Sequence, residues 1–237
     1  MRKAIIVGIL VFLALVLVRM PAGIIQWFVP DGSQARVLSP EGTLWTGNGE
    51  LIVQGISTGV LSWSVRPVTL LKGKVGYDLS LAGAGTDIDA RLEAGLASSE
   101  GVINGTVQGA FVNRWLAPYY IELAGVFEIV EVSLTLEGRS LTELAGRLTW
   151  DGGPIRYRLS GKVHDSALPP MTADLGPGPV AVAYATGEST PLLQAALNGN
   201  GFARIGVTKY LTRILGQPWP GGDPDHAVVL EVEEQVF

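Results

Sequence analysis

The chain of 237 residues contains no cysteine and only two histidines. The absence of cysteine excludes disulfide bonds, thiolate catalysis and metal sites with sulfur ligands. A domain outside the cytoplasm without disulfides depends on a hydrophobic core, and a chain of this length can form one. We therefore expect a domain held together by packing and hydrogen bonds alone.

Positive charge is scarce after the first 28 residues. Three of the 17 basic residues lie in that segment and none of the 22 acidic residues do, so the remainder has a net charge of −8. Such a domain does not bind nucleic acid through its phosphates. It also lacks the basic patch that would hold it on anionic lipid headgroups.

Reactive side chains do not gather in any known catalytic motif. The sequence has no G-x-S-x-G nucleophile elbow, P-loop or G-x-G-x-x-G segment after a strand. The nearest candidate for metal ligands is the turn with Asp223, Asp225 and His226. We interpret it as a solvated turn, because a metal site needs further ligands at short spacing. The sequence predicts no catalytic residue, no cofactor and no metal.

The first 28 residues contain the longest apolar stretch. Residues 4–18 carry no polar side chain, Arg19 interrupts the run, and a mostly apolar course resumes up to Ile25. Residues 4–18 alone would rise about 22 Å as a helix, short of the roughly 30 Å hydrocarbon core. A helix that continues to Ile25 closes this gap if Arg19 reaches the headgroups. Trp27 and Phe28 then lie at the membrane interface, where aromatic residues gather.

A cleaved signal peptide is the alternative for this segment, since it also has a basic start and a short apolar region. Its cleavage site should have small residues, whereas Arg19 and Met20 are large, so we favour a retained transmembrane anchor over residues 1–28. The basic residues Arg2 and Lys3 precede the run, which places the N-terminus in the cytoplasm and the bulk of the chain on the other side.

After residue 50 apolar and polar residues alternate with the period of a half-buried strand. Turns rich in glycine separate these segments at intervals of about ten residues. Strands joined by short turns, without long helices between them, indicate a mainly β, curved antiparallel meander or sandwich-like domain over residues 29–237. Clear examples of the alternation are residues 61–66, 75–81, 87–94, 103–111 and 230–233.

Three local features modify this meander. Within residues 127–136 the alternation changes phase, which predicts a β-bulge that bends a long strand. Thr208 is placed to cap a short helix over Lys209–Leu215 that Gly216 ends. A single helical turn is expected over Asn113–Leu116. Residues 165–179 are rich in proline and glycine, and we expect there an irregular connection and a possible subdivision of the domain.

A short motif carries a family resemblance. Gly42-Thr43-Leu44-Trp45-Thr46-Gly47 precedes Trp63-Ser64-Val65-Arg66-Pro67, and Leu70-Leu71-Lys72-Gly73 follows. This order resembles the type II secretion system protein N family, in which G-T-[LV]-W-x-G leads into W-x-[LV]-x-P and L-x-x-G after one membrane helix. The resemblance covers residues 1–82. The matched positions, expected to set a hairpin and its packing, are Gly42, Leu44, Trp45, Gly47, Trp63 and Pro67.

The resemblance implies a single-pass protein of the Gram-negative inner membrane whose periplasmic domain assists the secretion of folded proteins across the outer membrane. It implies no enzyme activity, and its partners would be other inner-membrane or periplasmic components of the secretion apparatus. The alternative is a membrane-tethered, AsmA-like β-groove that carries lipid or another hydrophobic ligand. An open apolar face across several strands would favour the carrier, whereas a face filled by side chains and the helix after Thr208 would favour a scaffold.

Overall fold

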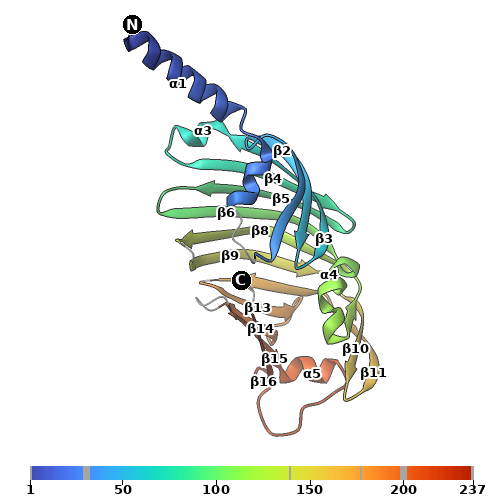
Figure 1. The fold of residues 1–237 in the computed structure, drawn as a ribbon. Coiled ribbons are helices and arrows are strands. Elements are labelled where there is room, and N and C mark those ends of the chain that lie inside the picture. The colour runs from blue at the N-terminus through green and yellow to red at the C-terminus, as the bar shows by residue number, and fades with distance from the viewer. Residues whose placement is uncertain (1, 29–32, 139, 177, 198–201, 236–237) are drawn as a thin grey trace.

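A computed structural model describes residues 2–28, 33–138, 140–176, 178–197 and 202–235, apart from some side chains in and near the end segments. Most of the chain forms one antiparallel sheet of thirteen strands in the order β1-β2-β3-β4-β5-β6-β8-β9-β12-β13-β14-β15-β16, and a second sheet has the order β11-β10-β7. Figure 1 shows the large sheet with α1 projecting from one end and α5 at the other.

The strands of the large sheet are β1 (Ala35–Gly42), β2 (Thr46–Val53), β3 (Ile56–Arg66), β4 (Val75–Gly83), β5 (Thr86–Ala94), β6 (Ser98–Gln108), β8 (Val126–Glu137), β9 (Ser140–Trp150), β12 (Met171–Leu175), β13 (Val180–Ala185), β14 (Pro191–Leu197), β15 (Phe202–Thr208) and β16 (Val228–Gln235). The small sheet contains β7 (Ile121–Leu123), β10 (Gly153–Leu159) and β11 (Lys162–Leu168). The helical segments are α1 (Arg2–Val18), η1 (Ala22–Ile24), α2 (Ile25–Phe28), α3 (Pro67–Leu70), α4 (Gly109–Leu116), η2 (Ala117–Tyr119) and α5 (Lys209–Ile214).

The prediction of a mainly β, antiparallel chain with few helices is confirmed. Nearly all neighbouring strands are consecutive in sequence, because short turns return the chain beside the strand it has just formed. The order departs from this pattern where β7, β10 and β11 leave the large sheet to form the small one. Leu123, Ile155 and Leu168 of the small sheet pack with Trp150 and Met171 of the large one.

The predicted bulge in the long strand is also confirmed. The pairing of β8 with β9 shifts register between Val130 and Ser133. Glu131 has φ 47°, a left-handed conformation in which a non-glycine residue is uncommon. Its backbone N–H is bonded by the Asn104 side chain of β6 at 2.8 Å. The extra residue lets both ends of β8 keep their apolar side chains on the same face.

The short C-terminal helix forms where its capping signals predicted it. The Thr208 hydroxyl accepts a hydrogen bond from the Leu211 N–H, and the chain leaves the helix through Gly216 at φ 72°. Leu211 is buried against Trp150, Met171 and other side chains of the large sheet. The predicted turn at Asn113–Leu116 is longer than expected, since α4 begins at Gly109.

The expected continuous helix to Ile25 is wrong. The helix α1 ends at Val18, and Pro21 adopts an extended conformation with φ −70° and ψ 151° before η1 and α2 begin. Proline disfavours the helical conformation of the residue before it, so the helix ends ahead of Met20. Among the residues that the structure describes, no helix combines the length and the apolarity needed to cross a membrane.

The expected irregular connection over residues 165–179 is wrong as well. Most of this segment belongs to β11 and β12, and only the pair Pro169-Pro170 separates the two strands. The strand β12 pairs with both β9 and β13, and Met171 at its start is buried. Proline and glycine therefore mark the ends of strands here, and the sheet continues past them.

We predict that Thr208→Val destabilises the fold by about 1–3 kcal/mol, because valine neither caps α5 nor bonds the carbonyls of Pro191 and Leu192. The measurement is the midpoint of denaturant unfolding. Thr142→Val is the control, because its exposed hydroxyl donates one hydrogen bond to Thr135, and its effect should stay within about 0.5 kcal/mol. Equal effects of the two substitutions would contradict the prediction.

Candidate functional site: the helix junction and the apolar face

The first family-motif segment forms the turn between β1 and β2. Gly42 pairs with Gly47 across this hairpin, and the Thr43 N–H donates to the carbonyl of Thr46 at 2.8 Å. The Thr43 hydroxyl accepts hydrogen bonds from the N–H groups of Trp45 and Thr46. These contacts leave Leu44 and Trp45 at the tip of the hairpin, facing the end of α1.

The tip of the hairpin caps the C-terminus of α1. The indole N–H of Trp45 donates to the carbonyl of Leu17 at 2.7 Å, and the Leu44 N–H donates to the carbonyl of Met20 at 2.8 Å. Pro21 forms an isolated bridge with Thr43. The last carbonyls of a helix have no partner within the helix. The motif therefore supplies partners to two carbonyls at or just after this helix end and fixes α1 to the sheet.

Trp63 holds the same hairpin from β3. Its side chain is 5% exposed, and its indole N–H donates to the carbonyl of Thr43 at 3.0 Å. A Cβ on Gly47 would lie 2.6 Å from the Trp63 ring and still closer to the Glu41 carbonyl. Glycine at position 47 is thus what allows the indole to lie against β2. We call the contacts of Leu44, Trp45, Gly47 and Trp63 with each other and with α1 the helix junction.

Tyr77 completes the helix junction, and sequence analysis did not single it out. Its hydroxyl donates to the carbonyl of Leu44 at 3.3 Å, and burial raises the pKa of this hydroxyl above its ordinary value. The group therefore stays a hydrogen-bond donor at neutral pH. The alternation over residues 75–81 predicts that Tyr77 lies on the apolar face of its strand. No local signal in the sequence indicates that Tyr77 contacts the hairpin of β1 and β2.

The other predicted positions lie apart from the helix junction. Pro67 is the first residue of α3, where its missing N–H costs no helical hydrogen bond. Arg19 is exposed in the turn after α1. The side chains of Trp27 and Phe28 lie outside the part of the chain that the structure describes.

One face of the large sheet is apolar along nearly its whole length. Side chains that lie opposite each other on antiparallel strands share a face, so one row can be followed through the register from β3 to β16. No member of this row is polar. The row consists of Leu61, Leu81, Ile88, Gly105, Ile129, Leu148, Ala173, Ala183, Leu193, Val207 and Leu230. At about 4.8 Å per strand it extends roughly 50 Å.

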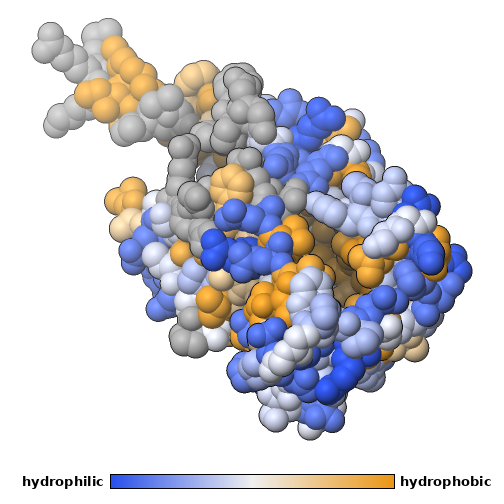
Figure 2. Space-filling view, turned by 90° about the horizontal axis from the view of Figure 1, so that it is seen from below, coloured by the Kyte–Doolittle hydropathy of each residue, from blue (hydrophilic) through white to orange (hydrophobic). Residues whose placement is uncertain are grey.

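Two clusters cover parts of this apolar face. Near α1, Ala22 and Ile25 pack on Trp63 and its neighbours. At the other end Leu211 and Ile214 of α5 pack on Trp150 and the adjoining strands. Elsewhere apolar side chains on this face remain accessible, at 36–48%, among them Leu92, Ile205, Leu230 and Val232. Figure 2, seen from below, shows a hollow lined by hydrophobic residues.

The opposite face of the sheet is polar and carries ion pairs between neighbouring strands. Arg66 binds Glu93 at 3.0 Å, and Arg147 binds Asp174 at 2.9 Å. The carboxylate of Asp78 lies 3.5 Å from Arg91. These pairs are partly or fully exposed, so each contributes little to stability. They do keep the face hydrated and leave the apolar face as the one able to bury hydrophobic groups.

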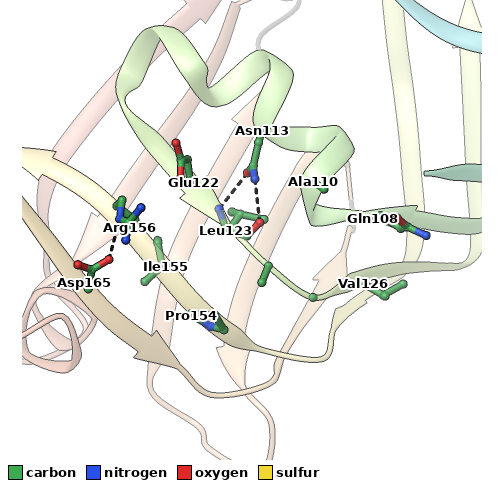
Figure 3. A pocket seen from close by; sticks show the side chains of 12 residues that line it. Gln108, Ala110, Asn113, Glu122, Leu123, Val126, Pro154, Ile155, Arg156 and Asp165 are labelled. Atoms are coloured by element: carbon green, nitrogen blue, oxygen red, sulfur yellow. Dashed lines mark hydrogen bonds and ion pairs between the residues drawn. The ribbon is translucent and has the colours of Figure 1, made fainter. Parts of the chain in front are cut away.

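A cavity of about 560 Å³ lies between α4, β7 and β10. The Asn113 amide forms two hydrogen bonds with the backbone of Leu123, and Arg156 binds Asp165 at 2.8 Å on the opposite wall (Figure 3). The Asp165 carboxylate raises the pKa of Arg156. Asn113 is thus satisfied by the backbone and Arg156 by Asp165, and we assign no chemistry to the cavity.

The turn singled out as a candidate metal site is held by cations of the chain itself. The Lys209 ammonium donates to the carbonyls of Gly221 and Asp223 at 2.7 and 2.8 Å, and Arg213 binds Asp225 at 2.8 Å. Within the described ranges, no three or more histidine and acidic side chains are grouped to hold a metal ion.

Comparison with known proteins identifies the family. The sequence model of "Type II secretion system (T2SS), protein N" matches residues 34–204. The chain belongs to the type II secretion system protein N family. The match includes the hairpin, Trp63 and most of the apolar face, and it extends far beyond the motif that carried the resemblance. No curated protein and no solved structure matches the chain.

Membership of the protein N family makes this chain a component of the type II secretion system. The family is associated with the cell envelope, and its members act together with other components of the same system. It is known as a structural family and not as an enzyme family.

We predict that Gly47→Ala destabilises this protein N homologue by about 1–3 kcal/mol, since the added methyl group clashes with both the Trp63 ring and the Glu41 carbonyl. The measurement is again the midpoint of denaturant unfolding. Gly222→Ala is the matched control, because a Cβ there meets nothing within 4 Å, and its effect should be within about 0.5 kcal/mol. A stable Gly47→Ala protein would show that the contact between β2 and the indole is not required.

Proposed function

We propose that this protein is a non-catalytic scaffold of the type II secretion apparatus, held at the inner membrane by α1 and exposing its sheet to partners in the periplasm. The helix junction carries this proposal. Trp45 and Leu44 fix the sheet to the helix end through direct hydrogen bonds of 2.7 and 2.8 Å. A sheet fixed in this way keeps one orientation relative to the membrane, as a scaffold requires.

The character of α1 supports its place in lipid. Its described apolar side chains, among them Ile5, Phe12 and Val18, are about half exposed or more in the chain alone. A helix that is apolar on all sides is stable when apolar surroundings cover it. Lipid provides such surroundings, and the arginine at position 19 lies just beyond the helix end, where a headgroup would pair with it.

Replacement of α1 tests the scaffold. We expect that a chain in which a cleavable signal peptide replaces residues 1–18 reaches the periplasm but does not support secretion, because its sheet is no longer held at the membrane. An unrelated transmembrane helix joined at Arg19 should restore secretion. The measurement is the fraction of a type II substrate in the medium, in cells that lack the native gene.

Full secretion with the cleaved version would rule out a required anchor. Normal secretion in cells without the gene would rule out a required scaffold.

A second function is favoured by the open part of the apolar face, which could hold an acyl chain. This face starts beside η1, which follows α1 directly, so a hydrophobic ligand could pass from lipid onto it without crossing the polar face. Partial filling by α5 favours the scaffold, whereas the exposed Leu92 and Ile205 favour a ligand. The two functions are compatible, since they use different parts of the molecule.

For the lipid function we predict that phospholipid co-purifies with the protein and that Leu92→Glu lowers its amount several-fold, because the carboxylate enters the apolar face. Val102→Glu is the matched control. Val102 is exposed to a similar extent, 41% against 36%, but lies on the polar face of the adjoining strand. Both variants keep α1, so lipid around that helix cancels in the comparison by mass spectrometry. Equal lipid content in the two variants would exclude the apolar face as its site.

A further inference from the structure

The two edges of the large sheet, β1 and β16, differ in how far they are open to another strand. An edge strand presents unpaired backbone N–H and C=O groups, and proteins usually protect such edges with proline, charged side chains such as lysine, bulges or covering segments. Since β1 and β16 end the strand order of the large sheet, each of them is such an edge.

The edge at β1 is protected. Pro40 lies within the strand and has no N–H to donate. The register shifts between Leu38 and Glu41, and Ser39 has φ 47°. Ala22 packs against Val37 on the inner face. These irregularities prevent regular pairing of another strand with β1.

Within the described residues, the edge at β16 is regular over most of its length, and its charged side chains are glutamates. Its eight residues contain no proline and no lysine, and they pair in unbroken register with β15 from Phe202 opposite Gln235 to Val207 opposite Leu230. The only irregularity comes at the start, between Val207 and Thr208. In Figure 1, β16 lies at the lower end of the sheet, far from α1.

The side chains of β16 define what kind of strand could pair with it. Leu230 and Val232 lie on the apolar face and are 42% and 48% exposed, while Glu231 and Glu233 lie on the polar face. On the side of β16 that pairs with β15, Arg204 of β15 binds Glu231 at 3.2 Å and lies opposite Glu233 in the register. The same carboxylates are accessible from the unpaired edge of β16. A basic residue on an added strand would form ion pairs with them, as Arg204 does from β15.

Pairing with a second copy is disfavoured by the same charges. Two antiparallel β16 strands with their apolar residues on one face would bring glutamates of both copies together on the other face. Like charges directly opposite each other on a sheet are destabilising. The pattern therefore selects a strand of different sequence.

We propose that β16 is a docking edge for a partner protein, which adds a strand of alternating apolar and basic residues to the large sheet. The apolar residues of that strand extend the apolar face beyond Leu230 and Val232, and its Lys or Arg side chains pair with Glu231 and Glu233. Backbone hydrogen bonds provide affinity, and the alternating side chains provide specificity. This inference rests on the proposed scaffold function and names the surface that it uses.

Binding of designed peptides to the full-length protein in a neutral detergent tests the docking edge. The probe is a ten-residue peptide of alternating valine and lysine, and the control peptide has glutamate in place of lysine. We expect the lysine peptide to bind about tenfold more tightly, from attraction in one case and repulsion in the other. The measurement is fluorescence anisotropy, with protection of β16 amides from hydrogen exchange as a second readout.

Two charge variants separate edge pairing from general attraction. Glu233→Lys leaves Glu231 as the one carboxylate of the pair and should abolish the peptide preference, whereas Glu143→Lys, an equal charge change on β9 in the middle of the sheet, should leave it unchanged. Equal effects of both variants, or protection of amides outside β16, would overturn the proposal. The proposal would also be overturned if the wild-type protein sedimented as a dimer and Glu233→Lys changed that sedimentation, because β16 would then pair with a second copy. If the peptide does not bind but loss of the gene still abolishes secretion, the docking edge is wrong and the scaffold stands.

Discussion

The large sheet is curved (Figure 1), and this curvature follows from its one-sided chemistry. One face is apolar from β3 to β16, and neither helices nor the small sheet cover it completely. A flat sheet of this kind would expose the whole face to water, at about 25 cal/mol for each Å² of apolar surface. Curving onto that face brings the rows of side chains together. The bulge at Glu131, which shifts the register of β8 against both β6 and β9, bends β8 without turning its apolar residues outward.

The helix junction links this curved sheet to α1. A helix end needs partners for its last carbonyls, a hairpin tip has free donors, and the motif brings the two together through Leu44 and Trp45. Trp63 supports the hairpin from the neighbouring strand and reaches it only because residue 47 is glycine. The residues that resemble the family are thus those that determine how the helix meets the sheet. The charged face, the open apolar face and the edge at β16 are all positioned relative to α1 by this contact.

Much of the strand pattern could be predicted from alternation alone, because an exposed and a covered face impose period two on every strand. The cap of α5 could be predicted because Thr208 and Gly216 act within a few residues of each other. The same local rules failed where a distant partner decides. Within residues 165–179, β12 forms because β9 and β13 offer partners on both sides, and β11 forms because it pairs with β10. The end of α1 before Pro21 follows instead from a local rule, since proline disfavours the helical conformation of the residue before it.

By itself the sequence determined the antiparallel class, the positions of several strands, the bulge in β8 and the short C-terminal helix, since each depends on neighbours in the chain. It also indicated the family, through a motif whose spacing is local. Only the tertiary structure decided that three strands leave to form a second sheet, that Tyr77 and Trp63 meet the hairpin of β1 and β2, and that one edge of the sheet is blunted while the other is open. Those outcomes depend on contacts between segments tens of residues apart. Periodicity indicates which face of a strand a residue occupies, but it does not indicate which residue of another segment that face contacts.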